Sequence, residues 1–140
     1  MKLSSIRRGA FLALAVSASA LAPLAAGAHP TPPNANPALV RVWSAAPPNK
    51  VIIKQLGPGV YTLQVIAACT PPCNWGAQRM LVFGPSVSAA VGNIGVATFN
   101  QGFAKRTVIA TLINPKTLSV QILSEMMDTR SNYSTTMIYH

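Results

Sequence analysis

The clearest structural pattern in the sequence lies in residues 104–126, which read AKRTVIATLINPKTLSVQILSEM. Apolar and polar side chains alternate on both sides of the turn-forming segment Asn-Pro-Lys at 114–116. The side chains that this alternation places on one face are Val108, Ala110, Leu112, Leu118, Val120 and Ile122. A period of two is typical of antiparallel strands with one buried and one solvated face, so this stretch is predicted to form a β-hairpin.

Similar short β-type segments, separated by turn formers, occupy most of the rest of the chain. The eight predicted strands are residues 39–45, 50–56, 60–68, 78–84, 93–100, 104–113, 117–126 and 132–139. Between them stand turn signals such as Pro47-Pro48-Asn49 and Gly57-Pro58-Gly59. Residues 85–92 are expected to form a loop or one helical turn. The predicted fold is all-β, a single small antiparallel up-and-down barrel, because closure removes exposed sheet edges; a β-sandwich is the alternative.

The N-terminal segment has the three parts of a secretory signal. Lys2, Arg7 and Arg8 are followed by an Ala- and Leu-rich stretch that ends in small residues at 26–28. This order predicts an N-terminal signal helix over residues 1–28, with cleavage between Ala28 and His29. The protein is therefore expected to be periplasmic or secreted.

Cleavage would leave about 112 residues, which suits one domain with one core. Residues 29–37 contain four prolines and no apolar periodicity, so they are predicted to be a flexible lead-in. Residues 38–140 are predicted to form the barrel domain, as a monomer without a transmembrane span.

Removal of the signal also lowers the net charge. The whole chain carries +9, and residues 29–140 carry eight basic side chains against Glu125 and Asp128, a net +6. Such a surface favours an anionic partner, for example an envelope lipid or an acidic polysaccharide; solubility alone is the blander interpretation. Aromatic residues make up 6% of the chain and do not interleave with the basic ones, so specific nucleic-acid binding is not expected.

Cys69 and Cys73 are the only two cysteines. In an oxidising compartment the default for such a pair is a disulfide. It would close a very small loop and stabilise the fold by about 2 kcal/mol, as a local staple. A redox role is the less favoured alternative, because active dithiols are usually Cys-x-x-Cys at a helix N-terminus.

Four sequence features resemble a group of small exported bacterial β-barrel domains. The most specific is the turn Cys69-Thr-Pro-Pro-Cys73-Asn74-Trp75-Gly76. The others are a first strand that contains Trp43, the segment Asn-Gln-Gly-Phe at 100–103 and the segment Arg-Ser-Asn-Tyr at 130–133. The resemblance implies export and a calycin-like barrel, and it carries over no catalytic residue.

The sequence offers little for catalysis. Glu125 and Asp128 are the only acids in residues 29–140, and two carboxylates alone would have to supply a hydrolase mechanism. His29 and His140 have no neighbouring ligands at metal-site spacing, so no metal site or cofactor is predicted.

Non-covalent binding is the expected mode of action. Aromatic and arginine side chains carry much of the recognition energy in proteins. The candidate binding residues at the barrel mouths are Trp43, Tyr61, Trp75, Arg79, Arg130 and Tyr133. Trp75 has two interpretations, a plug of the barrel end with Gly76 allowing close packing or a stacking platform for a ligand. The functional hypotheses are a binding module for an envelope or extracellular component, an inhibitor or protein-interaction domain, and, least favoured, a hydrolase that uses Glu125 or Asp128.

Overall fold

The computed structural model describes residues 31–140 of the chain. The predicted signal peptide, the cleavage position between Ala28 and His29 and the start of the lead-in lie outside the described residues.

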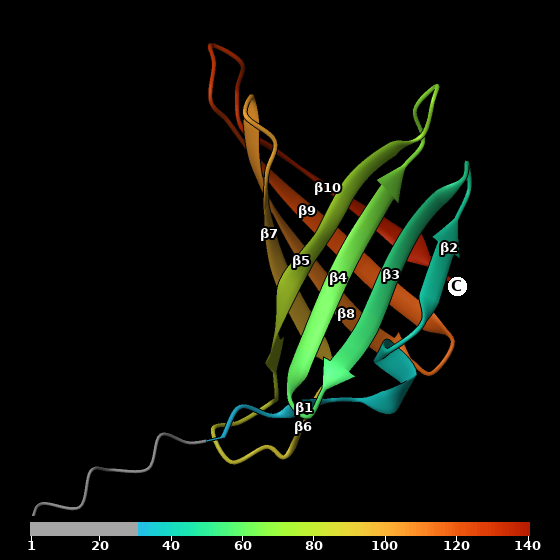
Figure 1. Ribbon diagram of the computed structural model, residues 1–140, viewed down its shortest axis with the longest axis vertical. Helices are drawn as coiled ribbons and strands as arrows, with labels where there is room; N and C mark the ends of the chain where they lie inside the picture. Colours follow the sequence, from blue (N-terminus) through green and yellow to red (C-terminus); the bar gives the residue numbers. More distant parts are fainter. Residues whose placement is uncertain (1–30) are drawn as a thin grey trace, which may run out of the picture.

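Eight antiparallel strands form one sheet that curls into a nearly closed barrel (Figure 1). The strands are β2 (Val42–Ala45), β3 (Asn49–Gly57), β4 (Val60–Ala67), β5 (Cys73–Phe83), β7 (Ile94–Asn100), β8 (Ala104–Asn114), β9 (Thr117–Met126) and β10 (Tyr133–Tyr139). Their order, β10-β9-β8-β7-β5-β4-β3-β2, follows the chain. Two backbone hydrogen bonds between Ser44 and His140, of 3.1 and 2.9 Å, join the two outer strands. The prediction of a small up-and-down barrel is confirmed.

The barrel consists of two four-stranded halves. Figure 1 shows β2 to β5 in front, with β7 to β10 crossing behind them. The halves meet on one side where Leu81–Phe83 pair with Ile94–Val96, although β5 and β7 both extend well beyond this segment. The barrel wall is therefore incomplete between β5 and β7.

The predicted alternation sets the buried faces. Val108, Ala110 and Leu118 are fully buried, and Val120 and Leu112 are nearly so. Their strands pair in register, Ala110 opposite Val120 and Leu112 opposite Leu118. The largest fully buried side chains are those of Trp43, Tyr139 and Phe99. Burial of these apolar surfaces is the main source of stability.

The N-terminal segment closes one end of the barrel. β1 (Asn34–Ala35) pairs in parallel with β6 (Val91–Gly92), and the 3-10 helix η1 (Pro37–Leu39) follows. The Asn36 carboxamide oxygen accepts a hydrogen bond of 3.0 Å from the Ala38 N–H and caps this helix. Ala35, which belongs to the predicted lead-in, and Leu39, which follows it, are buried in the core. The lead-in therefore contributes packing as well as connection.

Two strands start three or more residues away from their predicted positions, and the other boundaries agree to within one residue. The first strand starts at Val42, because residues 37–39 form η1. β5 starts at Cys73, five residues before the predicted position, because a β-bulge at Trp75-Gly76 interrupts the alternation that the prediction used.

Candidate binding site

The two ends of the barrel are built differently. The closed end has the β3–β4 turn, the 84–93 connection and the N-terminal residues 34–39. The open end has the turns between β2 and β3, β4 and β5, β7 and β8, and β9 and β10 (Figure 1). The candidate site is at the open end.

A hollow of about 500 Å³ lies at the open end between the start of β5 and the β7–β8 turn. The side chains that line it are Ala67, Cys69, Cys73, Asn74, Trp75, Gln101, Phe103 and Arg106. Its volume is in the range of small-ligand sites. Most of its wall is apolar, and Arg106 is its only charged residue.

A bulge in β5 turns Trp75 towards the barrel interior. Gln64 pairs with Ala77 and Ile66 with Asn74, so Trp75 and Gly76 together lie opposite one residue of β4. The Gly76 φ of 78° is in the left-handed region, which favours glycine. A Cβ on Gly76 would meet nothing within 4 Å, so this glycine serves the backbone conformation and not the close packing considered from sequence.

Aromatic rings hold the Arg106 side chain in place. The Arg106 guanidinium lies 4.5 Å from the centroid of the Trp75 ring and 5.6 Å from that of Phe103. Trp75 in turn packs edge-on against the buried Phe99, with ring centroids 5.7 Å apart. These contacts fix the guanidinium at the mouth, in the manner of cation–π interactions. Trp75 is only partly buried, so it both covers the core and lines the hollow.

The charge of Arg106 is not matched by an acid of the described chain. Asp128 is bound to Arg130, with an N–O distance of 2.6 Å. Glu125 pairs in register with Lys105, the neighbour of Arg106 that lies on the opposite face of β8. Both acids are thereby placed beside other cations.

Three buried polar atoms without a hydrogen-bond partner occur in this part of the described chain. They are Nε of Arg106, Oε1 of Gln101 and Oγ of Ser124. Arg106 and Ser124 are register partners on neighbouring strands, and Gln101 lines the same hollow as Arg106. Buried polar atoms are normally satisfied, so this concentration is unusual and marks a polar cluster at this end of the barrel.

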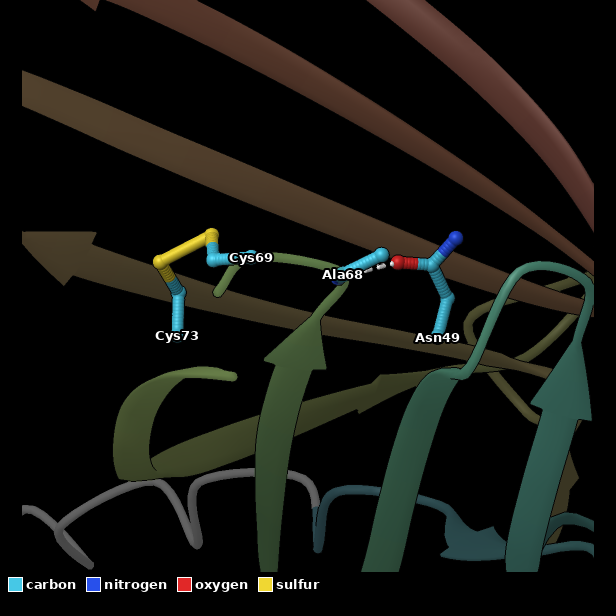
Figure 2. The surroundings of a disulfide bond; sticks show 4 residues. All are labelled: Asn49, Ala68, Cys69 and Cys73. Atoms are coloured by element: carbon cyan, nitrogen blue, oxygen red, sulfur yellow. Dashed lines mark hydrogen bonds between the residues drawn. A yellow bond between two sulfur atoms is a disulfide. The ribbon is translucent and has the colours of Figure 1, made fainter. Parts of the chain in front are cut away.

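The Cys69–Cys73 disulfide forms one wall of the hollow. Figure 2 shows the disulfide with the neighbouring Ala68 and Asn49. The two Cα atoms are 5.4 Å apart, and the prediction of this pair is confirmed. The Ala68 N–H beside it donates a 2.7 Å hydrogen bond to the Asn49 carboxamide oxygen. The disulfide turn is thereby attached to the β2–β3 turn, which stiffens the rim of the open end.

The structure separates the six predicted binding residues. Trp43 and Tyr61 are 0% and 3% exposed, so both belong to the core and present no surface to a ligand. Arg79 is exposed on the outer wall, opposite Thr62, because the bulge places it on the other face from Trp75. Of the six, Trp75 alone lines the candidate hollow.

Arg130 and Tyr133 lie near the site without lining the hollow. The Arg130 guanidinium is 5.5 Å from the centroid of the Phe103 ring. Tyr133 lines a second hollow, of about 530 Å³, along β8 to β10 with Lys105 and Glu125. In that second hollow the opposed charges of Lys105 and Glu125 offset each other, so it lacks the unmatched cation of the first.

Asp128 lacks the surroundings of a catalytic carboxyl. The hydrogen bonds from Arg130 hold the pKa of the Asp128 carboxyl below its usual value. A lowered pKa suits an ion pair and not a general acid at neutral pH. Asp128 therefore gives the hydrolase hypothesis no support.

Sequence reasoning missed Arg106, Phe103 and Gln101. Phe103 and Gln101 belong to the Asn-Gln-Gly-Phe segment at 100–103, so the available signal was the motif itself. Arg106, unlike its neighbour Lys105, falls on the inward face of β8, which the buried Ala104 and Val108 already mark.

In residues 31–140 no group of three or more His, Cys, Asp or Glu side chains is placed to hold a metal ion. Over the same residues, no helix has both the length and the apolar character required to cross a membrane. Comparison of the chain with protein-family models, curated proteins and solved structures finds no match.

Proposed function

We propose that this chain is an exported binding protein whose open end holds an anionic ligand by non-covalent contacts. The observation that carries the proposal is Arg106: a cation fixed between two aromatic rings, beside a hollow of about 500 Å³, with no acid opposite it in the described chain. An arginine with a planar fork of donors matches carboxylate, sulfonate and phosphate groups. The apolar wall formed by Trp75, Phe103 and the disulfide suits an apolar or ring-bearing part of the same ligand.

Export is part of this proposal. The signal pattern at 1–28 supports it, and the Cys69–Cys73 disulfide is compatible with an extracytoplasmic location. Mass spectrometry of the exported protein is expected to find His29 as its first residue. Recovery of the chain with Met1 intact in the extracytoplasmic fraction would contradict export by cleavage.

Binding is tested with 8-anilinonaphthalene-1-sulfonate, a fluorescent probe that combines a sulfonate with an apolar ring system. Its fluorescence is expected to rise on addition of the folded protein, and Arg106→Gln is expected to weaken binding about tenfold, because a charge-assisted contact is lost. The matched control is Arg41→Gln, which removes an arginine that lies over Trp43 near the closed end. Equal affinities of the Arg106 and Arg41 variants would contradict the proposed site.

A protein-interaction domain is the second candidate function. The incomplete pairing of β5 and β7 favours it, because unpaired strand edges are common sites of peptide addition.

A further inference from the structure

The facing edges of β5 and β7 are unpaired towards the open end. Their pairing is limited to Leu81–Phe83 and Ile94–Val96, but β5 begins at Cys73 and β7 ends at Asn100. Figure 1 shows the two strands diverging beyond the paired segment. Ala77, Gln78 and Arg79 on β5 are exposed, including Gln78, which the register places on the inward face with the buried Leu63.

The direction of the free backbone groups on β7 follows from one hydrogen bond. The Leu112 N–H donates to the Asn93 carbonyl oxygen at 2.8 Å, so odd-numbered residues of this segment direct their backbone groups to β8. Even-numbered residues direct their backbone groups to β5. Thr98 and Asn100 are therefore exposed with their N–H and C=O groups directed at the unpaired edge, where residues 31–140 provide no strand partner.

This edge leads directly to the candidate hollow. Asn100 is followed by Gln101, whose Oε1 has no partner, and Phe99 pairs in register with Arg106. Two kinds of group without a partner therefore lie close together: a strand edge, and a guanidinium with no acid opposite it in residues 31–140. An apolar wall between Trp75 and Phe103 lies beside them.

We infer that the ligand of the open end is an extended peptide with a free C-terminal carboxylate; this inference rests on the proposed function. The peptide main chain pairs with the backbone of Thr98 and Asn100, and its carboxylate binds Arg106. The last side chain of the peptide, an apolar one, occupies the hollow. Strand addition supplies affinity through main-chain hydrogen bonds, and the carboxylate and the hollow supply specificity. A single extended peptide satisfies the strand edge and the guanidinium at once.

The test uses the peptide acetyl-Ser-Val-Thr-Val-Leu with a free carboxylate, and the same peptide with a C-terminal amide. We expect the amide to bind about tenfold more weakly or worse, because it lacks the charge that pairs with Arg106. In Arg106→Gln the two peptides are expected to bind alike. Hydrogen exchange followed by NMR is expected to show slower exchange of the Thr98 and Asn100 amide protons only when the free-carboxylate peptide is present.

The variant Thr98→Pro distinguishes binding of the peptide from binding of other anions. Proline removes the Thr98 N–H, which faces the unpaired edge, and leaves the β7–β8 hydrogen bonds in place. We expect this variant to lose affinity for the peptide and to bind 8-anilinonaphthalene-1-sulfonate as the parent does. Near-ultraviolet circular dichroism reports whether the variant keeps the packing of the parent.

The outcomes distinguish the two proposals. If the sulfonate probe binds through Arg106 while the acid and amide peptides bind equally or not at all, the peptide inference is wrong and the proposed function stands. Arg106-dependent binding of an acidic oligosaccharide or a fatty acid without peptide binding would likewise overturn the peptide inference alone. If Arg106→Gln changes the binding of neither probe nor peptide, both proposals are wrong.

Discussion

Arg41 lies over Trp43 near the closed end of the barrel, and Arg106 lies over Trp75 at the open end. The Trp43 ring is fully buried, and its indole N–H donates a 3.1 Å hydrogen bond to the Leu39 carbonyl oxygen. Trp75 is only partly buried, and Nε of its arginine has no partner. The same pair of residue types therefore serves packing at one end and presents unsatisfied groups at the other. The difference comes from what covers each end.

The largest expected effect is on stability at the closed end. Trp43→Ala removes a fully buried ring and its hydrogen bond, and is expected to lower the free energy of unfolding by about 3–5 kcal/mol. Trp75→Ala is expected to cost clearly less, because its ring is partly exposed. Urea unfolding of both variants measures the contrast. Equal losses would mean that the two ends are packed alike.

The second-largest expected effect is the loss of stability when the disulfide at the open end is reduced. Reduction of Cys69–Cys73 is expected to lower stability by about 2 kcal/mol and the melting temperature by several degrees, with the fold retained. Calorimetry with and without reductant measures the change in melting temperature, and near-ultraviolet circular dichroism shows whether the barrel persists. Complete unfolding on reduction would show that the open end is essential to the core.

Gly76→Ala tests the bulge that turns Trp75 inwards. Because Gly76 has a φ of 78° and open space around its Cα, the expected cost is about 1 kcal/mol from backbone strain alone. Gly76→Asn is the matched control, since asparagine tolerates this conformation better than alanine. A smaller loss in the asparagine variant, measured by urea unfolding, supports the backbone explanation; equal losses contradict it.

At alkaline pH the core responds through Tyr139. Burial raises the pKa of this phenol, so the folded protein holds the proton more tightly than the unfolded chain. The resulting contribution is fully present below pH about 10 and is lost as the pH rises through the folded-state value. Tyr139→Phe is expected to flatten this alkaline loss in a series of unfolding curves. If stability falls with pH at the same slope in the parent and in the variant, Tyr139 is not the cause of the alkaline loss.

The smallest effect is expected on the acid side, at the rim of the open end. Hydrogen bonds from Arg130 lower the pKa of Asp128, so the contribution of this ion pair is present above the usual aspartate pKa and is lost as the pH falls through the lowered value. Both side chains are well exposed, so solvent screens the pair. Asp128→Asn is expected to leave the midpoint of urea unfolding at pH 7 almost unchanged. A large loss would indicate that the β9–β10 turn supports the barrel.

The sequence alone determined that eight strands form, the buried faces of most of them, and the disulfide. Alternation in residues 104–126 is a local property, and burial of one face follows from it wherever the strand is placed. Two cysteines four residues apart leave one possible intramolecular pair. Prediction of these features requires no knowledge of which strands are neighbours in the sheet.

Only the tertiary structure decided the rest. The bulge at Gly76 reverses the alternation of β5, so Trp75 faces the interior and Arg79 the outer wall. The short pairing of β5 with β7 leaves the open end unpaired, while residues 34–39 cover the other. Arg106 becomes distinctive because Asp128 and Glu125 lie beside other cations. Each of these depends on contacts between residues distant in sequence, which no local pattern encodes.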